Sequence, residues 1–234
     1  MIECISNLLD LQKNEVIAIV GSGGKTSLLQ HLAMENKDKK TLLSTTTKMY
    51  PPDCDKHITE DENLQIGRNL FYEQCRDGKI SVQDISKLKT LCQKADLSLL
   101  ECDGARMLPL KGWDDHEPQI PDFATLTIGI LPLWVLGAPV LGTHIHRLEH
   151  FCAITGAVVG EPITLAHFGA LITHPVGLFG KSVGRKVLFL NRKDEQSLRF
   201  ITDDFLARLP EDILVLSGNI HAGRADLLKE RTDA

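Results

Sequence analysis

The 234-residue chain has no C-x-x-C pair among its six cysteines, which argues against a zinc ribbon and a disulfide framework. It has no apolar run near the roughly 18–20 residues that cross a membrane. Its first residues lack the basic-then-apolar pattern of a secretory signal. The formal net charge of −5 gives no excess of positive charge with which to bind a nucleic acid. We therefore expect a cytoplasmic protein whose partners include neither a membrane nor a nucleic acid.

The most informative segment that is present is the hexad Gly21-Ser22-Gly23-Gly24-Lys25-Thr26. It lies between an apolar run at 16–20 and an amphipathic stretch at 28–33. A strand, a glycine turn and a helix in this order direct the unpaired N–H groups of the first helical turn toward a phosphate chain. Lys25 then offers an ammonium to the β- and γ-phosphates, and the Thr26 hydroxyl can bind Mg²⁺. The hexad predicts a loop that binds the phosphates of GTP or ATP, and we count the adjoining Ser27 with the hexad among the nucleotide-binding residues.

The hexad is shorter than the usual phosphate-binding motif, G-x-x-x-x-G-K-[ST]. Ile19 stands five residues before Gly24, where that motif has its first glycine. The remaining G-x-x-G-K-T loop is similar to the short form of Mur-type ligases. The alternative interpretation is a glycine turn in an ordinary βα unit.

Short apolar runs alternate with stretches of helical spacing along the chain. The runs suit strands that are buried on both faces of a parallel sheet, and they lie at residues 16–20, 42–44, 97–100, 126–131, 187–190 and 213–216. Helical spacing predicts helices near residues 28–33, 85–91, 148–155 and 198–209. We therefore predict a single P-loop NTPase-like α/β domain over 1–234, with a doubly wound, mainly parallel sheet flanked by helices. A loop-rich functional insertion is expected at about 104–184.

Polar residues directly follow the second and third predicted strands, where ligands of parallel sheets bind. Thr46 and Thr47 can contact Mg²⁺ or the γ-phosphate, although threonine also favours plain β-structure. Asp103 resembles the acidic residue that ends a strand beside a P-loop and holds the metal through its water shell. We predict that Thr26 and Asp103 hold Mg²⁺, with a turn or cap as the alternative role for Asp103. Glu101 is placed to orient a water or a substrate nucleophile.

The segment Asn191-Arg192-Lys193-Asp194 follows the fifth predicted strand. It resembles the N-K-x-D element in which asparagine and aspartate read the edge of guanine. A buried carboxylate that pairs with guanine N–H groups would be left unpaired by adenine, which gives such a site its selectivity. The alternative is a turn, because Asn and Asp are frequent in turns. GTP and ATP both stay open as the nucleotide.

The order of these and other motifs resembles the YqeC family, an accessory family linked to selenium-dependent molybdenum hydroxylases. The shared pattern spans most of the chain, at residues 21–26, 45–49, 101–106, 108–111, 116–121, 146–149 and 191–194. The resemblance implies a nucleotide-dependent role in maturing or inserting a selenium-containing molybdenum cofactor. The molybdenum cofactor and a molybdenum hydroxylase apoprotein would then be partners. Cys102 stands where an alanine-like residue is expected, so we do not assign it as a selenium carrier, and Leu148 stands where proline is more typical.

Basic residues and histidines between 106 and 147 predict further ligand contacts. We expect Lys111, Arg106 and Arg147 to bind an anion or a pterin phosphate, with His116 beside them, and Arg106 to stabilise charge in a transition state. Metal binding by His116, His144 and His146 is the alternative. Lys25, Glu101, Asp103 and Arg106 are thus the candidate catalytic residues of a Mg²⁺-dependent NTPase. A Mur-ligase-like or kinase-like transferase that uses ATP, and a nucleotide-binding regulatory module, are the other classes.

Overall fold

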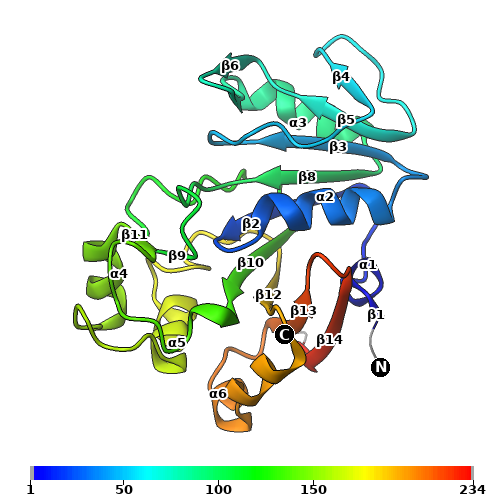
Figure 1. Cartoon of the computed structure of the whole chain (residues 1–234). Helices are drawn as coiled ribbons and strands as arrows, with labels where there is room; N and C mark the ends of the chain where they lie inside the picture. Colours follow the sequence, from blue (N-terminus) through cyan, green and yellow to red (C-terminus); the bar gives the residue numbers. More distant parts are fainter. Residues whose placement is uncertain (1–2, 233–234) are drawn as a thin grey trace.

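A computed structural model describes residues 3–232, and a ten-stranded sheet forms their centre (Figure 1). In chain order the strands of this sheet are β1 (Glu3–Cys4), β2 (Glu15–Gly21), β3 (Lys40–Thr45), β4 (Lys56–Ile58), β5 (Gly67–Phe71), β8 (Leu97–Glu101), β10 (Leu126–Pro132), β12 (Arg185–Asn191), β13 (Ile213–Asn219) and β14 (Arg224–Lys229). Their order across the sheet is β1-β14-β13-β12-β10-β2-β8-β3-β5-β4. Seven of the nine neighbouring pairs are parallel, and both antiparallel pairs include β14.

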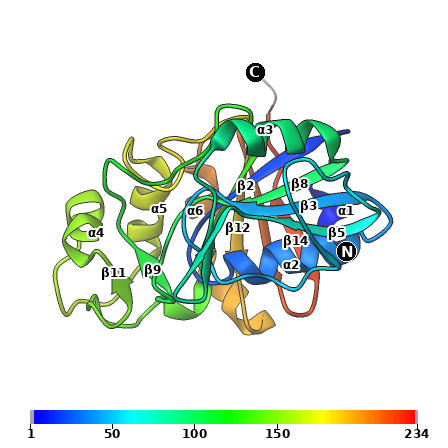
Figure 2. The same ribbon diagram turned by 90° about the horizontal axis from the view of Figure 1, so that it is seen from above.

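Helices cover both faces of the sheet. The helical segments are α1 (Ile5–Leu8), α2 (Lys25–Glu35), α3 (Ile85–Lys94), α4 (Leu148–Thr155), α5 (Leu165–Thr173) and α6 (Asp203–Ala207), with 3₁₀ turns η1 (Leu133–Val135) and η2 (Glu195–Phe200). Viewed from above, α2 and α3 lie on opposite faces (Figure 2). Every residue of β2 is buried, because successive side chains of a strand point to opposite faces and both faces are covered. Ile17 and Ile19 pack in the cluster that contains α2, and Ala18 and Val20 in the cluster that contains α3.

The six predicted strands are confirmed as β2, β3, β8, β10, β12 and β13. The predicted helices near 28–33, 85–91 and 148–155 are present as α2, α3 and α4. The predicted helix at 198–209 is wrong. Its residues form the end of η2 and the separate short helix α6, because the Thr202 hydroxyl accepts a hydrogen bond from the N–H of Phe205 and starts a new helix there.

Residues 104–184 supply β10 to the centre of the sheet and otherwise form loops, α4, α5 and a small parallel pair, β9 (Leu110–Lys111) and β11 (Ile145–His146). An antiparallel hairpin, β6 (Gln74–Arg76) and β7 (Lys79–Ser81), lies outside the main sheet. The sheet is thus mixed but mostly parallel, as predicted. Within residues 3–232 no helix has the length and apolar character needed to cross a membrane.

Candidate functional site

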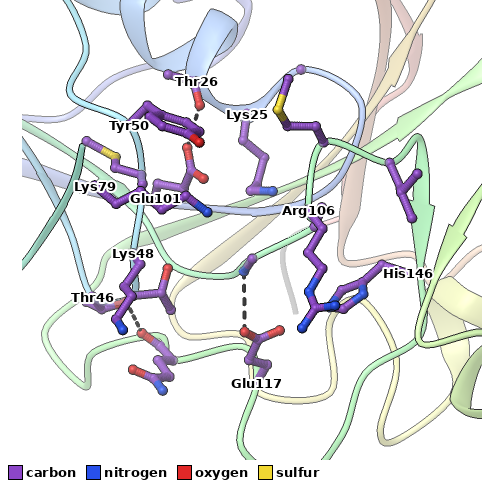
Figure 3. Close-up of a pocket in the computed structure, with 18 of the residues that line it drawn as sticks. Lys25, Thr26, Thr46, Lys48, Tyr50, Lys79, Glu101, Arg106, Glu117 and His146 are labelled. Atoms are coloured by element: carbon purple, nitrogen blue, oxygen red, sulfur yellow. Dashed lines mark hydrogen bonds between the residues drawn. The ribbon is translucent and has the colours of Figure 1, made fainter. Parts of the chain in front are cut away.

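A cleft of about 1300 Å³ opens at the carboxyl ends of three adjacent strands, β2, β8 and β3. Ligands of parallel sheets bind at this edge. The segments that follow these strands contribute most of its lining, at residues 23–27, 46–50 and 104–109. The rest of the lining comes from the β6–β7 hairpin region and from Glu101, Glu117, Gln119, Trp134, His146 and Arg147. Three of the predicted strand-end residues, Thr46, Thr47 and Glu101, therefore line one cleft, and Figure 3 shows Thr46 and Glu101 in it.

The glycine loop between β2 and α2 adopts a backbone that only glycine fits. Gly21 and Gly24 have φ angles of +93° and +141°. A Cβ at Gly21 would lie 2.3 Å from the carbonyl oxygen of Ile130, and one at Gly24 would lie 2.7 Å from Cδ1 of Ile220. The loop thus passes so close to its neighbours that a side chain at Gly21 or Gly24 has no space. The helix α2 begins at Lys25, directly after Gly24.

Two of the predicted ligand residues hold this loop in place. Ser22 is fully buried, and its hydroxyl donates to the carbonyl of Pro109 at 2.9 Å. The Asn191 amide donates to the carbonyl of Gly23 at 2.7 Å. Asn191 is 5% exposed and lies outside the cleft lining. Both side chains therefore fix the backbone that would face a phosphate chain.

Lys25 lies at the first turn of α2, and its ammonium is directed under the glycine loop. Its Nζ donates to the carbonyl of Gly21 at 2.8 Å and lies 3.3 Å from Oδ1 of Asp103. Burial alone would lower the pKa of Lys25, but the nearby Asp103 and Glu101 carboxylates outweigh it and raise that pKa. The side chain therefore carries a positive charge at the floor of the cleft.

Thr26 meets Glu101 across the cleft floor. The Thr26 hydroxyl donates to Oε2 of Glu101 at 2.7 Å (Figure 3). Burial raises the pKa of the Glu101 carboxyl, even though the Lys25 charge lowers it. The structure thus places Glu101, two residues before the predicted partner Asp103, beside the Thr26 hydroxyl.

Thr46 and Thr47 follow β3 and line the cleft, and their contact with Mg²⁺ or a γ-phosphate stays a prediction. The Thr46 hydroxyl donates to the carbonyl of Gln119 at 2.6 Å. The Thr47 N–H donates to the hydroxyl of Thr45 at 3.1 Å. The first bond joins the loop after β3 to the segment that carries Glu117, and the second stabilises the turn of that loop.

Asp103 lies beneath the cleft and is fully buried. Its Oδ2 accepts hydrogen bonds from the Gly21 N–H at 3.0 Å, the Trp113 indole at 3.1 Å and the Lys111 ammonium at 3.3 Å. Its Oδ1 has no hydrogen-bond partner among the described residues and faces Lys25. Burial alone would raise the pKa of Asp103, but the two ammonium groups and these hydrogen bonds hold it below 3.8. Asp103 therefore ties the glycine loop to the charges below it.

A chain of buried and half-buried charges continues from Asp103 to the far wall of the cleft. Lys111 is 0% exposed, and its Nζ donates to the carbonyl of Gly104 at 2.6 Å and to Oε2 of Glu117 at 2.5 Å. Arg147 donates to the same Glu117 oxygen at 2.6 Å and pairs with Asp114 at 3.1 Å. Lys111 was predicted as an anion ligand, but the structure buries it in this chain, outside the cleft lining.

The other residues predicted between 104 and 147 separate into two groups. Arg106, His146 and Arg147 line the cleft, whereas His116 is exposed outside it, with its N–H bonded to Asp114. Within residues 3–232 no three His, Cys, Asp or Glu side chains are grouped as a metal site would require. Glu117 lines the cleft although we did not predict it, and the only sequence signal was its place between His116 and a proline.

Asp194 caps the 3₁₀ turn η2. Its Oδ1 accepts hydrogen bonds from the N–H and the hydroxyl of Ser197, each at 2.9 Å, at the start of η2. Neither Asp194 nor Asn191 lies among the residues that line the cleft. Guanine recognition by this pair stays a prediction.

The burial of Cys102 predicts an unreactive thiol. Burial raises the pKa of Cys102 to about 12 and that of Cys92 to about 11, whereas Cys75 is exposed. Because the thiolate is the reactive form, we expect iodoacetamide to modify Cys75 in the native protein, and Cys92 and Cys102 only after denaturation. Peptide mass spectrometry of native and denatured samples measures this, with Cys75→Ser as control. Rapid native modification of Cys102 would contradict its assignment as a packing residue.

The fold and the site define an α/β protein whose cleft opens on a glycine loop between a central strand and a helix. A sequence model described as YqeC protein matches residues 17–149, more than half of the chain. The chain is 34% identical over 194 residues to a protein of Escherichia coli (strain K12) described as "Uncharacterized protein YqeC", covering 76% of this chain and 75% of that protein. The chain therefore belongs to the YqeC family, and the resemblance noted from its motifs is confirmed. No solved structure is significantly similar to it.

Proposed function

We propose that the protein is a P-loop nucleotide-binding protein that hydrolyses GTP or ATP with Mg²⁺. The observation that carries this proposal is the glycine loop, which joins the buried strand β2 to α2 and delivers Lys25 and Thr26 to the cleft floor. N–H groups at a helix N-terminus and a positive charge beside them are the chemistry that phosphate groups bind. The position of the cleft at the strand ends agrees with this use.

The donors on the cleft floor fit a magnesium ion. Mg²⁺ prefers oxygen ligands and retains several waters, and the Thr26 hydroxyl and Glu101 carboxylate lie together at 2.7 Å. We assign these two residues to the ion, and Asp103 to the support of Lys25 and the loop. When bound, Mg²⁺ neutralises charge on the β- and γ-phosphate oxygens. Arg106, in the loop after β8, is the candidate for stabilising further charge in the transition state.

The biological role that we propose is nucleotide-dependent maturation or insertion of a selenium-containing molybdenum cofactor into a molybdenum hydroxylase apoprotein. Membership of the YqeC family supports this role, because the resemblance to that family is what implied a link to molybdenum hydroxylases. A transferase that uses the nucleotide to activate a small substrate, in the manner of Mur-type ligases or kinases, is the second candidate. The size of the cleft favours this second candidate, because about 1300 Å³ exceeds the roughly 300–1,000 Å³ of a pocket for one ligand.

A thermal-shift and fluorescence experiment tests nucleotide binding. We expect GTP or ATP with Mg²⁺ to raise the melting temperature, because a ligand at 100 times its Kd stabilises the folded state by about 2.7 kcal/mol. Trp134 lines the cleft and Trp113 is buried under it, so intrinsic fluorescence should change on binding, and Trp134→Phe should remove most of the change. Calorimetry with GDP and ADP then tests base preference. Absence of any shift with all of these nucleotides would refute the proposal.

A further inference from the structure

The wall of the cleft opposite Thr26 carries positive charges that the protein itself does not neutralise. We call the side chains of Lys48, Arg106 and His146 the cationic wall, in which Lys48 and Arg106 carry the charge; all three line the cleft, as does Lys79 nearer to Glu101 (Figure 3). Figure 3 shows Thr26 and the base of Lys25 at one end of the view, and Lys48, Arg106 and His146 toward the other. Among residues 3–232, Lys48 and Arg106 have no ion pair with an acidic side chain, and the Lys79 ammonium lies over the Tyr50 ring, 5.1 Å from its centroid.

The two acidic residues of the cleft do not offset this wall. Glu117 is already bonded to Lys111 and Arg147, and Glu101 lies at the cleft floor, where it bonds to Thr26 and interacts with the charge of Lys25. Burial, and after it the charges of Arg147, Lys111 and Arg106, lowers the pKa of His146, so this imidazole is neutral near pH 7 and the positive charge of the wall comes from Lys48 and Arg106. A protein with a net charge of −5 therefore concentrates uncompensated positive charge in one cleft, and this favours an anionic ligand.

Backbone strain is concentrated in the same cleft. Six described non-glycine residues have positive φ, and three of them are Asp or Asn, which tolerate it. The other three are Arg106 (47°), Met107 (62°) and Arg147 (54°), and all of them line the cleft. Strained residues of other types persist where the surrounding structure holds them, and such residues gather at ligand sites. Met107, which is 90% exposed, stands at this site as a large apolar side chain free to cover a ligand.

The phosphate chain of a nucleotide does not require this wall. Lys25, the loop N–H groups and Mg²⁺ supply the charge that such a chain needs, and they come from the opposite side of the cleft. We propose that the cationic wall binds a second, anionic substrate, a small molecule with a phosphate or carboxylate group, beside the nucleotide. This inference rests on the proposed nucleotide function and adds the substrate class of the same cleft.

Calorimetry on the full chain tests this inference with the nucleotide position already filled. The protein is saturated with Mg²⁺ and a β,γ-imido nucleoside triphosphate, and then titrated with inorganic phosphate or with succinate. We expect one of these anions to bind with one-to-one stoichiometry, and the two titrations distinguish phosphate from carboxylate chemistry. The double variant Lys48→Gln/Arg106→Gln should weaken that binding at least tenfold. Its affinity for the corresponding nucleoside diphosphate should change less than threefold, because the charge that Arg106 is proposed to stabilise during hydrolysis develops only in the transition state.

The matched control is Lys37→Gln/Arg224→Gln, which removes the same charges at exposed positions outside the cleft and should leave anion binding unchanged. Absence of anion binding in the saturated protein, or an equal loss in the control, would overturn the second-substrate site. If no nucleotide binds, the anions are titrated into the nucleotide-free protein. If anion binding is then weakened by Lys48→Gln/Arg106→Gln but not by Lys25→Ala, the cationic wall is an anion site. The proposed nucleotide function is then rejected.

Discussion

The variant Lys25→Ala is expected to lose nucleotide binding while it keeps its fold. A hydrogen bond to a charged partner contributes about 1.5–3 kcal/mol, and an ammonium that reaches two phosphates makes more than one, so we expect Kd to rise about 100-fold. Asp103 retains its bonds to Lys111, Trp113 and the Gly21 N–H and is not left as an isolated charge. Calorimetry with Mg²⁺-nucleotide measures the loss, and thermal unfolding measures stability.

Two further variants make the result for Lys25 specific. Lys25→Met keeps the length of the apolar stem without the charge, so it should bind nucleotide as poorly as Lys25→Ala. Lys37→Ala removes an exposed lysine outside the cleft and should bind nucleotide like the native protein. Native affinity in both Lys25 variants would mean that the glycine loop is an ordinary strand-to-helix turn.

The sequence predicted the centre of the sheet well because burial leaves a strong pattern. β2, β8, β10 and β13 read as apolar runs, since a strand covered on both faces has little room for polar side chains. The edges were missed for the opposite reason. β4 and β5 contain Lys56, His57 and Asn69, and β14 includes Arg224 and Asp226, so neither a run nor an alternation marks them. These strands form because they pair with neighbouring strands in the folded sheet, and the local pattern of apolar residues does not predict such pairing.

The sequence predicted which loops form the candidate site, but it did not predict which side chains bond to one another there. Strand-end position brought Thr26, Thr46, Glu101 and Arg106 to the cleft, because the carboxyl ends of parallel strands share one edge. Sequence spacing cannot tell which of two carboxylates near a strand end enters the cleft, since Glu101 and Asp103 both follow the same alternation. The bend after Glu101, where β8 ends, sends Asp103 beneath the glycine loop. Lys111 was misjudged for a similar reason, because its partner Glu117 comes from a separate loop.

The exchange of Asp103 for asparagine is expected to destabilise the protein more than any other single change to the cleft. Removing one member of a buried charge pair costs about 3–5 kcal/mol, because the remaining charge stays desolvated. Asp103 touches two such partners, Lys25 and Lys111. Chemical denaturation of Asp103→Asn at neutral pH measures the loss. Binding of nucleotide with and without Mg²⁺ should weaken by the same factor, because Asp103 supports the loop and not the ion.

The pH dependence gives this prediction a definite sign. The charges of Lys25 and Lys111, which outweigh burial, hold the pKa of Asp103 below its usual 3.8 in the folded state. The unfolded state therefore binds this proton more readily, and the stabilisation is complete above about pH 4 and is lost as the pH falls through the folded pKa. The difference in unfolding free energy between the native protein and Asp103→Asn should therefore shrink below about pH 4. A difference that stays constant to lower pH would contradict the assigned charge pairing.

Glu101→Gln is the matched comparison, and the opposite pattern is expected for it. Burial raises the pKa of Glu101, so the folded state binds its proton more tightly and the ionised carboxylate lowers stability as the pH rises above about 4.5. The variant should therefore be at least as stable as the native protein at neutral pH. It should weaken Mg²⁺-nucleotide binding more than metal-free binding, since a carboxylate beside Thr26 is lost. If Asp103→Asn instead shows the larger metal-dependent loss, the magnesium ligand is Asp103, as the sequence first predicted, and Glu101 positions the Thr26 hydroxyl.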